Sequence, residues 1–343
     1  MRPLGSDMLW GIRNGSRNSD IMQPAPQTPV TVLTGYLGAG KTTLLNRILT
    51  ESHGRKYAVI VNEFGEVGID NDLVVDTDEE IFEMNNGCIC CTVRGDLIRI
   101  IEGLMRRRDR FDAILIETTG LADPAPVAQT FFVDDDVRAK TQLDSIVTVV
   151  DARHLLGEIE TAHEAQEQLA FADTILLNKI DLVTAEELDR VVKRIRRINP
   201  TATLHETRRC DIALDKVLGR GAFDLDRILE AEPDFLEGFH DHDHDDHVGS
   251  FALVSQEPLD PGKFMPWLNM IVQQFGTDML RLKGIVAFDG DPQRFVVQGV
   301  HMLLEGDHQR AWKPEEERRS RLVFIGRNLP KDVIEQGFLA CRA

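Results

Sequence analysis

The chain has 343 residues and is acidic: 57 Asp and Glu outnumber 39 Lys and Arg, and the formal net charge is −18. A surface of this sign repels phosphate backbones and anionic lipid, which argues against nucleic acid or a membrane as the main partner. No apolar run reaches the length that a bilayer span needs. The length suggests about two domains, each with a core of its own.

Residues 1–29 are rich in Gly, Ser, Asn, Pro and Gln and lack the apolar region of a signal peptide. We expect a disordered tail and no export. Three of the five cysteines crowd into Cys88, Cys90 and Cys91. An odd number of clustered cysteines without a signal peptide indicates metal or redox chemistry rather than a disulfide framework.

From Val30 onward, short apolar runs alternate with helical patterns. Apolar side chains at helical spacing recur after residue 97 and again after residue 187. The pattern predicts an α/β fold of the P-loop NTPase type, a mostly parallel sheet with helices on both faces. The predicted strands are Val30–Thr34, Tyr57–Val61, Ala113–Ile116, Ser145–Val150 and Thr174–Leu177.

The alternation ends near Thr207, and a different pattern follows a linker. We expect four domains or segments: the tail (1–29), the nucleotide-binding domain (30–215), a linker (216–249) and a smaller α+β domain (250–343). The last is predicted to hold two helices, Pro261–Phe275 and Pro330–Ala340, and four strands, Ser250–Ser255, Arg281–Ala287, Arg294–Val300 and Leu322–Ile325.

A glycine-rich segment between the first strand and a helical pattern matches the phosphate-binding loop. An ordinary turn does not need the Lys-Thr pair that ends this one. Its backbone N–H groups and the helix N-terminus would surround phosphate, Lys41 would reach the β- and γ-phosphates, and Thr42 would ligate Mg²⁺. The expected nucleotide contacts are Gly35, Gly38, Gly40, Lys41, Thr42 and Thr43.

A second motif, Asn178-Lys179-Ile-Asp181, follows a predicted strand and indicates the base. A carboxylate at Asp181 can accept both the N1–H and the amino hydrogens of guanine, whereas adenine presents the opposite pattern of donors. Ligands of α/β sheets bind at this end of the strands. Together with the phosphate-binding loop, the motif favours GTP over ATP.

Two acidic segments complete the expected nucleotide site. Glu117-Thr-Thr-Gly120 ends a strand, where a carboxylate can hold Mg²⁺ directly or through water. We expect Gly120 to leave room beside the γ-phosphate. Residues Asn62–Asp70 have the acidic and glycine-containing character of a switch loop, although an acidic surface loop would look the same.

The segment Gly87-Cys-Ile-Cys-Cys91 predicts a metal site. In an extended chain Cys88 and Cys90 face the same side, and Cys91 joins them if the chain turns. Thiolates favour Zn²⁺ and Cu(I), and three protein ligands leave a fourth position open for transfer. Cys88 and Cys91 also form a Cys-x-x-Cys, so a thiol oxidoreductase is the alternative. A redox role needs no GTPase, which favours the metal.

The stretch His240–His247 contains four histidines among four aspartates. We expect a solvated linker that binds several ions weakly, not the specific metal site.

These motifs, in this order, resemble the CobW-like GTPases, which are related to the nickel-insertion GTPases for urease and hydrogenase. The resemblance runs from about Val30 to the end of the chain and includes Arg281-x-Lys283-Gly284 and Gln298-Gly299. It implies a cytoplasmic metallochaperone or metal-homeostasis GTPase. Glu66 matches a switch-loop carboxylate that the family associates with its cysteine motif, so the implied metal ligands are Cys88, Cys90, Cys91 and Glu66.

We therefore expect slow GTP hydrolysis, with Lys41, Thr42 and Glu117 around Mg²⁺ and phosphate, and delivery of Zn²⁺ to a client metalloprotein. Members of the family differ in metal and client, and cobalt delivery for cobalamin synthesis is the nearest alternative. A zinc buffer whose nucleotide site acts only as a sensor is a further one. Stimulation of turnover by a client would favour the chaperone, whereas GTP-independent binding of many ions would favour the buffer.

Overall fold

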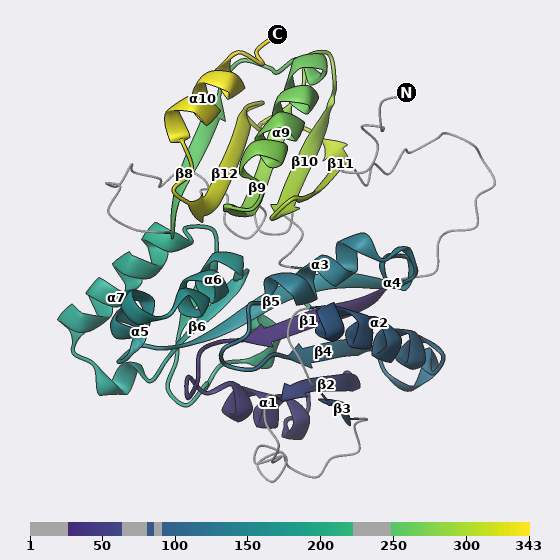
Figure 1. Cartoon of the computed structure of the whole chain (residues 1–343), viewed down its shortest axis with the longest axis vertical. Coiled ribbons are helices and arrows are strands. Elements are labelled where there is room, and N and C mark those ends of the chain that lie inside the picture. Colours follow the sequence, from purple (N-terminus) through teal and green to yellow (C-terminus); the bar gives the residue numbers. More distant parts are fainter. Residues whose placement is uncertain (1–26, 64–80, 86–90, 222–247) are drawn as a thin grey trace. The chain divides into compact units, whose positions relative to one another are not determined.

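The computed structural model describes residues 27–63, 81–85, 91–221 and 248–343 (Figure 1). They fall into two compact units, one built around strands β1–β7 and the other around β8–β12.

The first unit is a seven-stranded parallel sheet in the order β3-β2-β4-β1-β5-β6-β7. Two of its inner strands, Ala113–Glu117 and Thr174–Asn178, are buried at every residue because helices cover both faces. This confirms the predicted α/β class. The strands are β1 (Thr28–Thr34), β2 (Tyr57–Glu63), β3 (Ile81–Asn85), β4 (Ala113–Glu117), β5 (Thr141–Asp151), β6 (Thr174–Asn178) and β7 (Thr203–Glu206).

Seven helices accompany the strands within the described part of this unit. One face of the sheet packs on α1, whose Leu44, Leu45 and Ile48 are buried against β1, β2 and β4. Helices α2, α3 and α6 lie over the other face (Figure 1). The helices are α1 (Lys41–Thr50), α2 (Cys91–Met105), α3 (Ala125–Val133), α4 (Asp135–Lys140), α5 (Leu155–Thr161), α6 (His163–Phe171) and α7 (Ala185–Ile198).

Local sequence signals explain where α7 starts. The Thr184 hydroxyl accepts from the Glu187 amide at 3.2 Å, and the Glu187 carboxylate accepts from the Thr184 amide at 2.8 Å. This reciprocal pair satisfies two backbone donors that the helix itself leaves open. The apolar side of α7 then buries Val191, Ile195 and Ile198.

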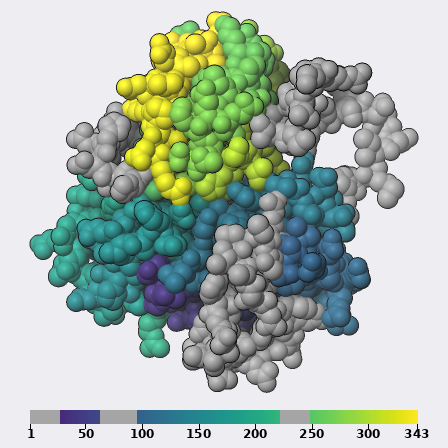
Figure 2. Space-filling view, viewed as in Figure 1, coloured from purple at the N-terminus to yellow at the C-terminus, as the bar shows by residue number. Residues whose placement is uncertain are grey.

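The second unit is a five-stranded antiparallel sheet in the order β11-β10-β9-β12-β8. Helices α9 (Pro261–Phe275) and α10 (Lys331–Leu339) pack on one face of it (Figure 1), and their surface is green and yellow in Figure 2. Aromatic rings of Phe264, Trp267, Phe324 and Phe338 meet in this core. The strands are β8 (Val248–Ser255), β9 (Met279–Ala287), β10 (Gln293–Val300), β11 (Leu303–Ala311) and β12 (Ser320–Arg327).

The structure differs from the sequence expectations at the borders of elements. β1 begins at Thr28, and both Thr28 and Pro29 pair with β5. These two residues therefore belong to the sheet and not to the tail, which we expected to extend to Pro29. Val217 and Leu218 are buried in the core of the first unit, past the domain end expected at residue 215. Strands β3, β7 and β11 were not predicted. Within the described residues, no helix is long and apolar enough to cross a membrane.

Gly337 of α10 generates a stability prediction. A methyl group there would lie 2.4 Å from the indole nitrogen of Trp267, which is 6% exposed and cannot move aside freely. We expect Gly337→Ala to lower the free energy of unfolding by about 1–3 kcal/mol, the usual cost of overpacking. Thermal and denaturant unfolding would measure it. Gly249→Ala in the same unit is the control, because its added methyl meets nothing within 4 Å; equal effects would contradict the packing argument.

Candidate nucleotide site

The phosphate-binding loop joins β1 to α1, and its glycines are required by its shape. Gly35, Gly38 and Gly40 all have positive φ, at 140°, 74° and 120°. A Cβ on Gly35 would lie 2.2 Å from the carbonyl oxygen of Val149, and one on Gly40 would lie 2.6 Å from Nδ2 of Asn178. Any side chain would therefore push the loop away from β5 and β6.

Lys41, Thr42 and Thr43 form the first turn of α1, as the motif requires. The Lys41 ammonium donates to the carbonyl oxygens of Gly35 at 2.8 Å and Tyr36 at 3.3 Å, so it bends back over the loop. Thr42 is half-buried and Thr43 is exposed. The positive end of the α1 backbone dipole and the Lys41 charge thus lie at the same place, which suits an anion.

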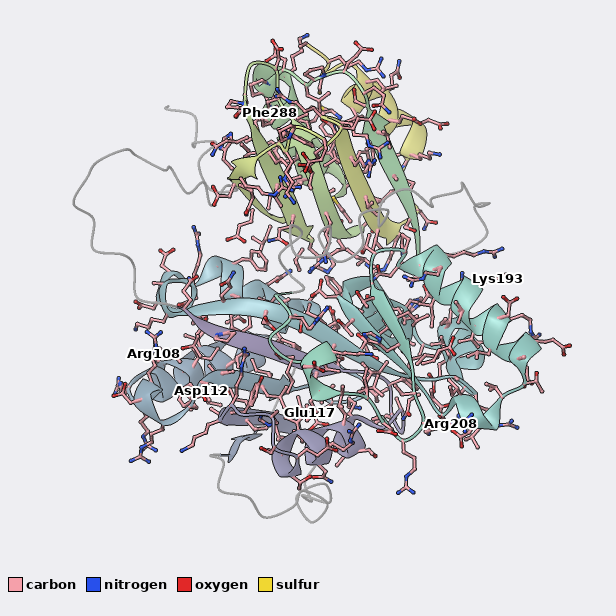
Figure 3. All side chains as sticks on the ribbon, turned by 180° about the vertical axis from the view of Figure 1, so that it is seen from behind. Arg108, Asp112, Glu117, Lys193, Arg208 and Phe288 are labelled. Atoms are coloured by element: carbon pink, nitrogen blue, oxygen red, sulfur yellow. The ribbon has the colours of Figure 1, made fainter. Side chains whose placement is uncertain are left out.

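The Glu117 segment runs directly beside the phosphate-binding loop. Glu117 ends β4 in register with Leu33 of β1, and the Thr118 amide donates to the Leu33 carbonyl at 2.9 Å. The Thr118 hydroxyl donates to that of Thr34 at 2.9 Å. In Figure 3, Asp112 marks the start of β4 and Glu117 its other end. Glu117 is 8% exposed.

Thr42 and Glu117 offer a hydroxyl and a carboxylate, the hard oxygen donors that Mg²⁺ takes in nucleotide sites. One comes from the first turn of α1 and the other from the strand beside β1. The donor set therefore fits a nucleotide-bound Mg²⁺.

Gly120 packs on the phosphate-binding loop itself. A Cβ there would lie 2.7 Å from the backbone nitrogen and 2.9 Å from the Cα of Leu37. Buried Gln168 of α6 holds the same segment, since its amide nitrogen donates to the carbonyls of Gly120 and Ala122, both at 3.1 Å. The missing side chain of Gly120 therefore lets this segment lie against Leu37, and the room that we expect beside the γ-phosphate stays a prediction.

Asn178 ties three loops together at the base end of the site. Its side-chain nitrogen donates to the Ala39 carbonyl of the phosphate-binding loop at 3.0 Å. Its side-chain oxygen accepts from the Cys210 amide at 2.9 Å and the Thr207 hydroxyl at 3.3 Å. The residue is 2% exposed, so each of these bonds is shielded from water.

The loop Thr207–Cys210, which follows β7, is a part of this site that the sequence analysis missed. Arg209 and Cys210 both have positive φ, 53° and 56°, which non-glycine residues rarely adopt. Burial raises the pKa of the Cys210 thiol to about 11, so at neutral pH the thiol is protonated. Arg208 of the same loop is exposed and labelled in Figure 3.

Lys179 and Asp181 extend the base loop. Lys179 has a left-handed backbone, with φ 62°, and its ammonium donates to the Gly38 carbonyl at 2.8 Å and to Asp151 Oδ2 at 2.7 Å. Asp181 lies in a short 3₁₀ turn, Ile180–Leu182, and is exposed. Its carboxylate is therefore accessible to a ligand beside the loop.

The expected metal ligands Glu66, Cys88 and Cys90 lie outside the described residues, as do most of the switch segment and His240–His247. Cys91 is the first residue of α2. β3 ends at Asn85 and is parallel to β2, so the chain that leads to the cysteines leaves the sheet at the edge where the phosphate-binding loop begins. In the part of the chain that the structure describes, no three His, Cys, Asp or Glu side chains cluster as a metal site.

Fold and site together define a P-loop nucleotide-binding protein with a separate carboxyl-terminal α+β unit. Two family models match the chain: the CobW/HypB/UreG nucleotide-binding domain over residues 29–206, and the cobalamin synthesis protein CobW carboxyl-terminal domain over residues 248–342. The chain therefore belongs to the CobW-like family of P-loop GTPases, which confirms the resemblance.

Named relatives cover most of the chain. The zinc chaperone YjiA of Escherichia coli is 36% identical over 91% of this chain and 98% of its own length. The zinc-regulated GTPase metalloprotein activator 1 of Schizosaccharomyces pombe is 34% identical over 88% of this chain and 82% of its own. A crystal structure of the Zn(II)-bound YjiA GTPase from E. coli superposes with a TM-score of 0.75 at 32% identity, covering 93% of this chain and 100% of that one.

The contact between Gly120 and Leu37 makes a prediction about nucleotide binding. We expect Gly120→Ala to displace the phosphate-binding loop and to weaken GDP binding by about tenfold or more, because backbone cannot yield as a flexible side chain can. Titration with a fluorescent GDP would measure this.

The control for Gly120→Ala is Gly103→Ala on α2, where an added methyl meets nothing within 4 Å. That substitution should stabilise the helix by about 0.5–1 kcal/mol and leave GDP affinity unchanged. Unaltered affinity in Gly120→Ala would show that the loop tolerates the methyl group.

Proposed function

We propose that this protein is a GTP-hydrolysing metallochaperone that binds Zn²⁺ at Cys88, Cys90 and Cys91, with Glu66, and transfers it to a client metalloprotein. The observation that carries the nucleotide half is Asn178, which joins the base loop, the phosphate-binding loop and the Thr207–Cys210 loop. A residue so buried and so fully bonded fixes the distance between base and phosphate sites.

In this proposal Asp181, three residues after Asn178 in the base loop, recognises guanine. Its exposed carboxylate can accept the two N–H groups of a guanine edge. Gly35, Gly38 and Gly40 shape the loop for phosphate. Lys179 connects the base loop to this phosphate-binding loop by its hydrogen bond to the Gly38 carbonyl. A nucleotide with an amino-substituted, N1–H base and two or more phosphates matches this arrangement.

For hydrolysis, Lys41 would neutralise charge on the β- and γ-phosphates, and Thr42 and Glu117 would hold Mg²⁺. The bound ion would supply charge neutralisation on the phosphate oxygens. The Glu117 segment is fixed to β1 by Thr118, and its Gly120 lies against Leu37 of the phosphate-binding loop. We therefore expect a movement of the Glu117 segment to move the phosphate-binding loop as well.

Zinc is favoured as cargo by the names of the relatives and by the donor type. The E. coli relative is a zinc chaperone and its structure holds Zn(II). Thiolates suit Zn²⁺ better than they suit harder ions, and a site of three thiolates keeps a position open for exchange. The activator relative from S. pombe supports a client metalloprotein as the acceptor. Cobalt delivery rests on the name of the carboxyl-terminal family model, a cobalamin synthesis protein, whereas the relatives named above are zinc proteins.

Asp181→Asn tests the base assignment. An amide in place of the carboxylate donates where guanine also donates, but it pairs with the carbonyl that xanthine carries at that position. We expect affinity for GTP to fall by about tenfold or more and affinity for xanthosine triphosphate to rise. Competition with a fluorescent nucleotide would measure both.

Asp189→Asn on α7 serves as the matched control for charge. Its carboxylate is 58% exposed and pairs with Lys193 of the same helix at 2.7 Å. Nucleotide preference should not change. If Asp181→Asn binds GTP like the wild type, guanine is not read by this carboxylate.

The coupling of metal to nucleotide gives a further prediction. If GTP assembles the thiolates and hydrolysis loosens them, zinc affinity must differ between the two states, and linkage requires the reciprocal effect on nucleotide preference. A coupling of about 1–3 kcal/mol corresponds to roughly 5–150-fold. Zinc competition titrations with GDP and with a non-hydrolysable GTP analogue would measure it, at fixed pH because thiolate binding releases protons.

Cys88→Ser should abolish tight zinc binding both with GDP and with the GTP analogue. Cys341→Ala is the control, because burial raises the pKa of this thiol to about 11 and keeps it protonated. Equal zinc affinity with the two nucleotides would refute coupled delivery even if both sites exist.

A further inference from the structure

Asp151 is a buried carboxylate at the carboxyl end of β5 that neither motif includes. Its side chain is 4% exposed. Oδ2 accepts from the Lys179 ammonium at 2.7 Å and from Nδ1 of His154 at 2.9 Å, while Oδ1 accepts from the Arg153 amide at 2.9 Å. Both oxygens are thus bonded, and one of them holds the lysine of the base loop.

Lys179 connects this carboxylate to the phosphate-binding loop. Its ammonium lies between Asp151 Oδ2 and the Gly38 carbonyl, at 2.7 and 2.8 Å. An ammonium on a flexible four-carbon chain has no fixed direction of its own. The buried Asp151 carboxylate on one side and the Gly38 carbonyl on the other fix the direction of the Lys179 ammonium.

The segment that carries Asp151 also holds the base loop at two further points. The Ala152 amide donates to the Asn178 carbonyl at 2.9 Å, and Nη1 of Arg153 donates to the Leu182 carbonyl at 3.0 Å. Asp151–Arg153 therefore binds the loop at its start, at its lysine and at its end. The contact of Asp151 reaches the phosphate-binding loop through the side chain of Lys179, which bonds to the Gly38 carbonyl.

We infer that Asp151 is a positioning residue for nucleotide binding, which acts through Lys179 to hold the base loop and the phosphate-binding loop at a fixed separation. The inference rests on the proposed guanine site. It adds a residue that need not touch the nucleotide, and it assigns Lys179 a second partner beyond the phosphate-binding loop.

The electrostatics at Asp151 agree with a bound carboxylate. Burial acts to raise the pKa of Asp151, but hydrogen bonds from Lys179, His154 and the Arg153 amide outweigh it, and the pKa lies below its ordinary value. The stabilisation is thus complete above the pKa of the unfolded chain and is lost as pH falls through the lower, folded-state pKa. Near neutral pH the carboxylate stays charged and Lys179 stays paired.

A double-mutant cycle on the full chain tests the inference. The dissociation constants of fluorescent GDP and of a fluorescent non-hydrolysable GTP analogue are measured for the wild type, Asp151→Asn, Lys179→Met and the double variant. We expect Asp151→Asn to weaken both nucleotides by about tenfold, and Lys179→Met by at least as much. The double variant should bind like Lys179→Met alone, because without Lys179 the carboxylate has no route to the nucleotide.

Kinetics add a readout that general destabilisation would not produce. Because the positioning acts on ground state and transition state alike, Asp151→Asn should raise KM for GTP while kcat stays within about twofold. Asp144→Asn is the matched control: it is a buried carboxylate on the same strand, but it bonds to the Gly221 amide at 2.7 Å and to the Thr31 hydroxyl at 3.4 Å. It should leave both dissociation constants unchanged.

Three results would overturn the inference: wild-type affinity in Asp151→Asn, losses that add fully in the double variant, or failure of Asp151→Asn to fold, which would make the residue purely structural. Failure of the proposed function looks different. In that case the wild type itself would bind guanine nucleotides no better than adenine nucleotides, while the cycle would still report whether Asp151 acts through Lys179.

Discussion

The hydrogen bonds of Asn178 are the interaction on which the nucleotide site depends. The side-chain nitrogen of Asn178 donates to a carbonyl of the phosphate-binding loop. Its side-chain oxygen accepts from a backbone amide and a hydroxyl of the Thr207–Cys210 loop. An aspartate could not donate to Ala39, and an aliphatic side chain would leave buried backbone groups unbonded at a cost of about 1–3 kcal/mol each. The close approach also explains Gly40, whose missing side chain makes room for the same amide.

The parallel sheet brings these loops together before any of them binds a ligand. β1, β4, β5 and β6 all run in one direction, so the segments that leave their carboxyl ends share one edge. Those segments hold the phosphate-binding loop, Glu117, Asp151 and Asn178 in turn. Small residues at Gly35 and Gly120 let neighbouring loops touch at backbone distance. The site is therefore crowded and tightly cross-connected, which suits a protein that must transmit a change at phosphate to another part of the chain.

The sequence predicted the inner strands and both nucleotide motifs, because buried parallel strands are continuously apolar and the motif residues are set by chemistry. It did not predict β3, β7 and β11, which are edge strands with one free side. β11 reads Leu-Leu-Glu-Gly-Asp-His-Gln-Arg-Ala, with too few apolar residues to signal a strand. The Thr207–Cys210 loop was missed with β7, the strand that leads to it. Asp151 was missed for another reason: its role lies in a contact with Lys179, 28 residues away, and no local pattern encodes it.

The order of the strands at one end of the sheet gives the coupling that we propose between metal and nucleotide a physical route. β2 lies between β3 and β4, with Glu63 in register with Asn85 and Val61 in register with Glu117. The end of β2 leads into the expected switch, the end of β3 leads to the cysteine motif, and the end of β4 carries the Glu117 segment. Three neighbouring strand ends thus precede the expected switch, the proposed metal-binding segment and the proposed Mg²⁺ ligand Glu117. Because Glu117 also pairs with β1, only two strand spacings, roughly 10 Å, separate this end of β4 from the end of β3, which precedes the cysteine segment.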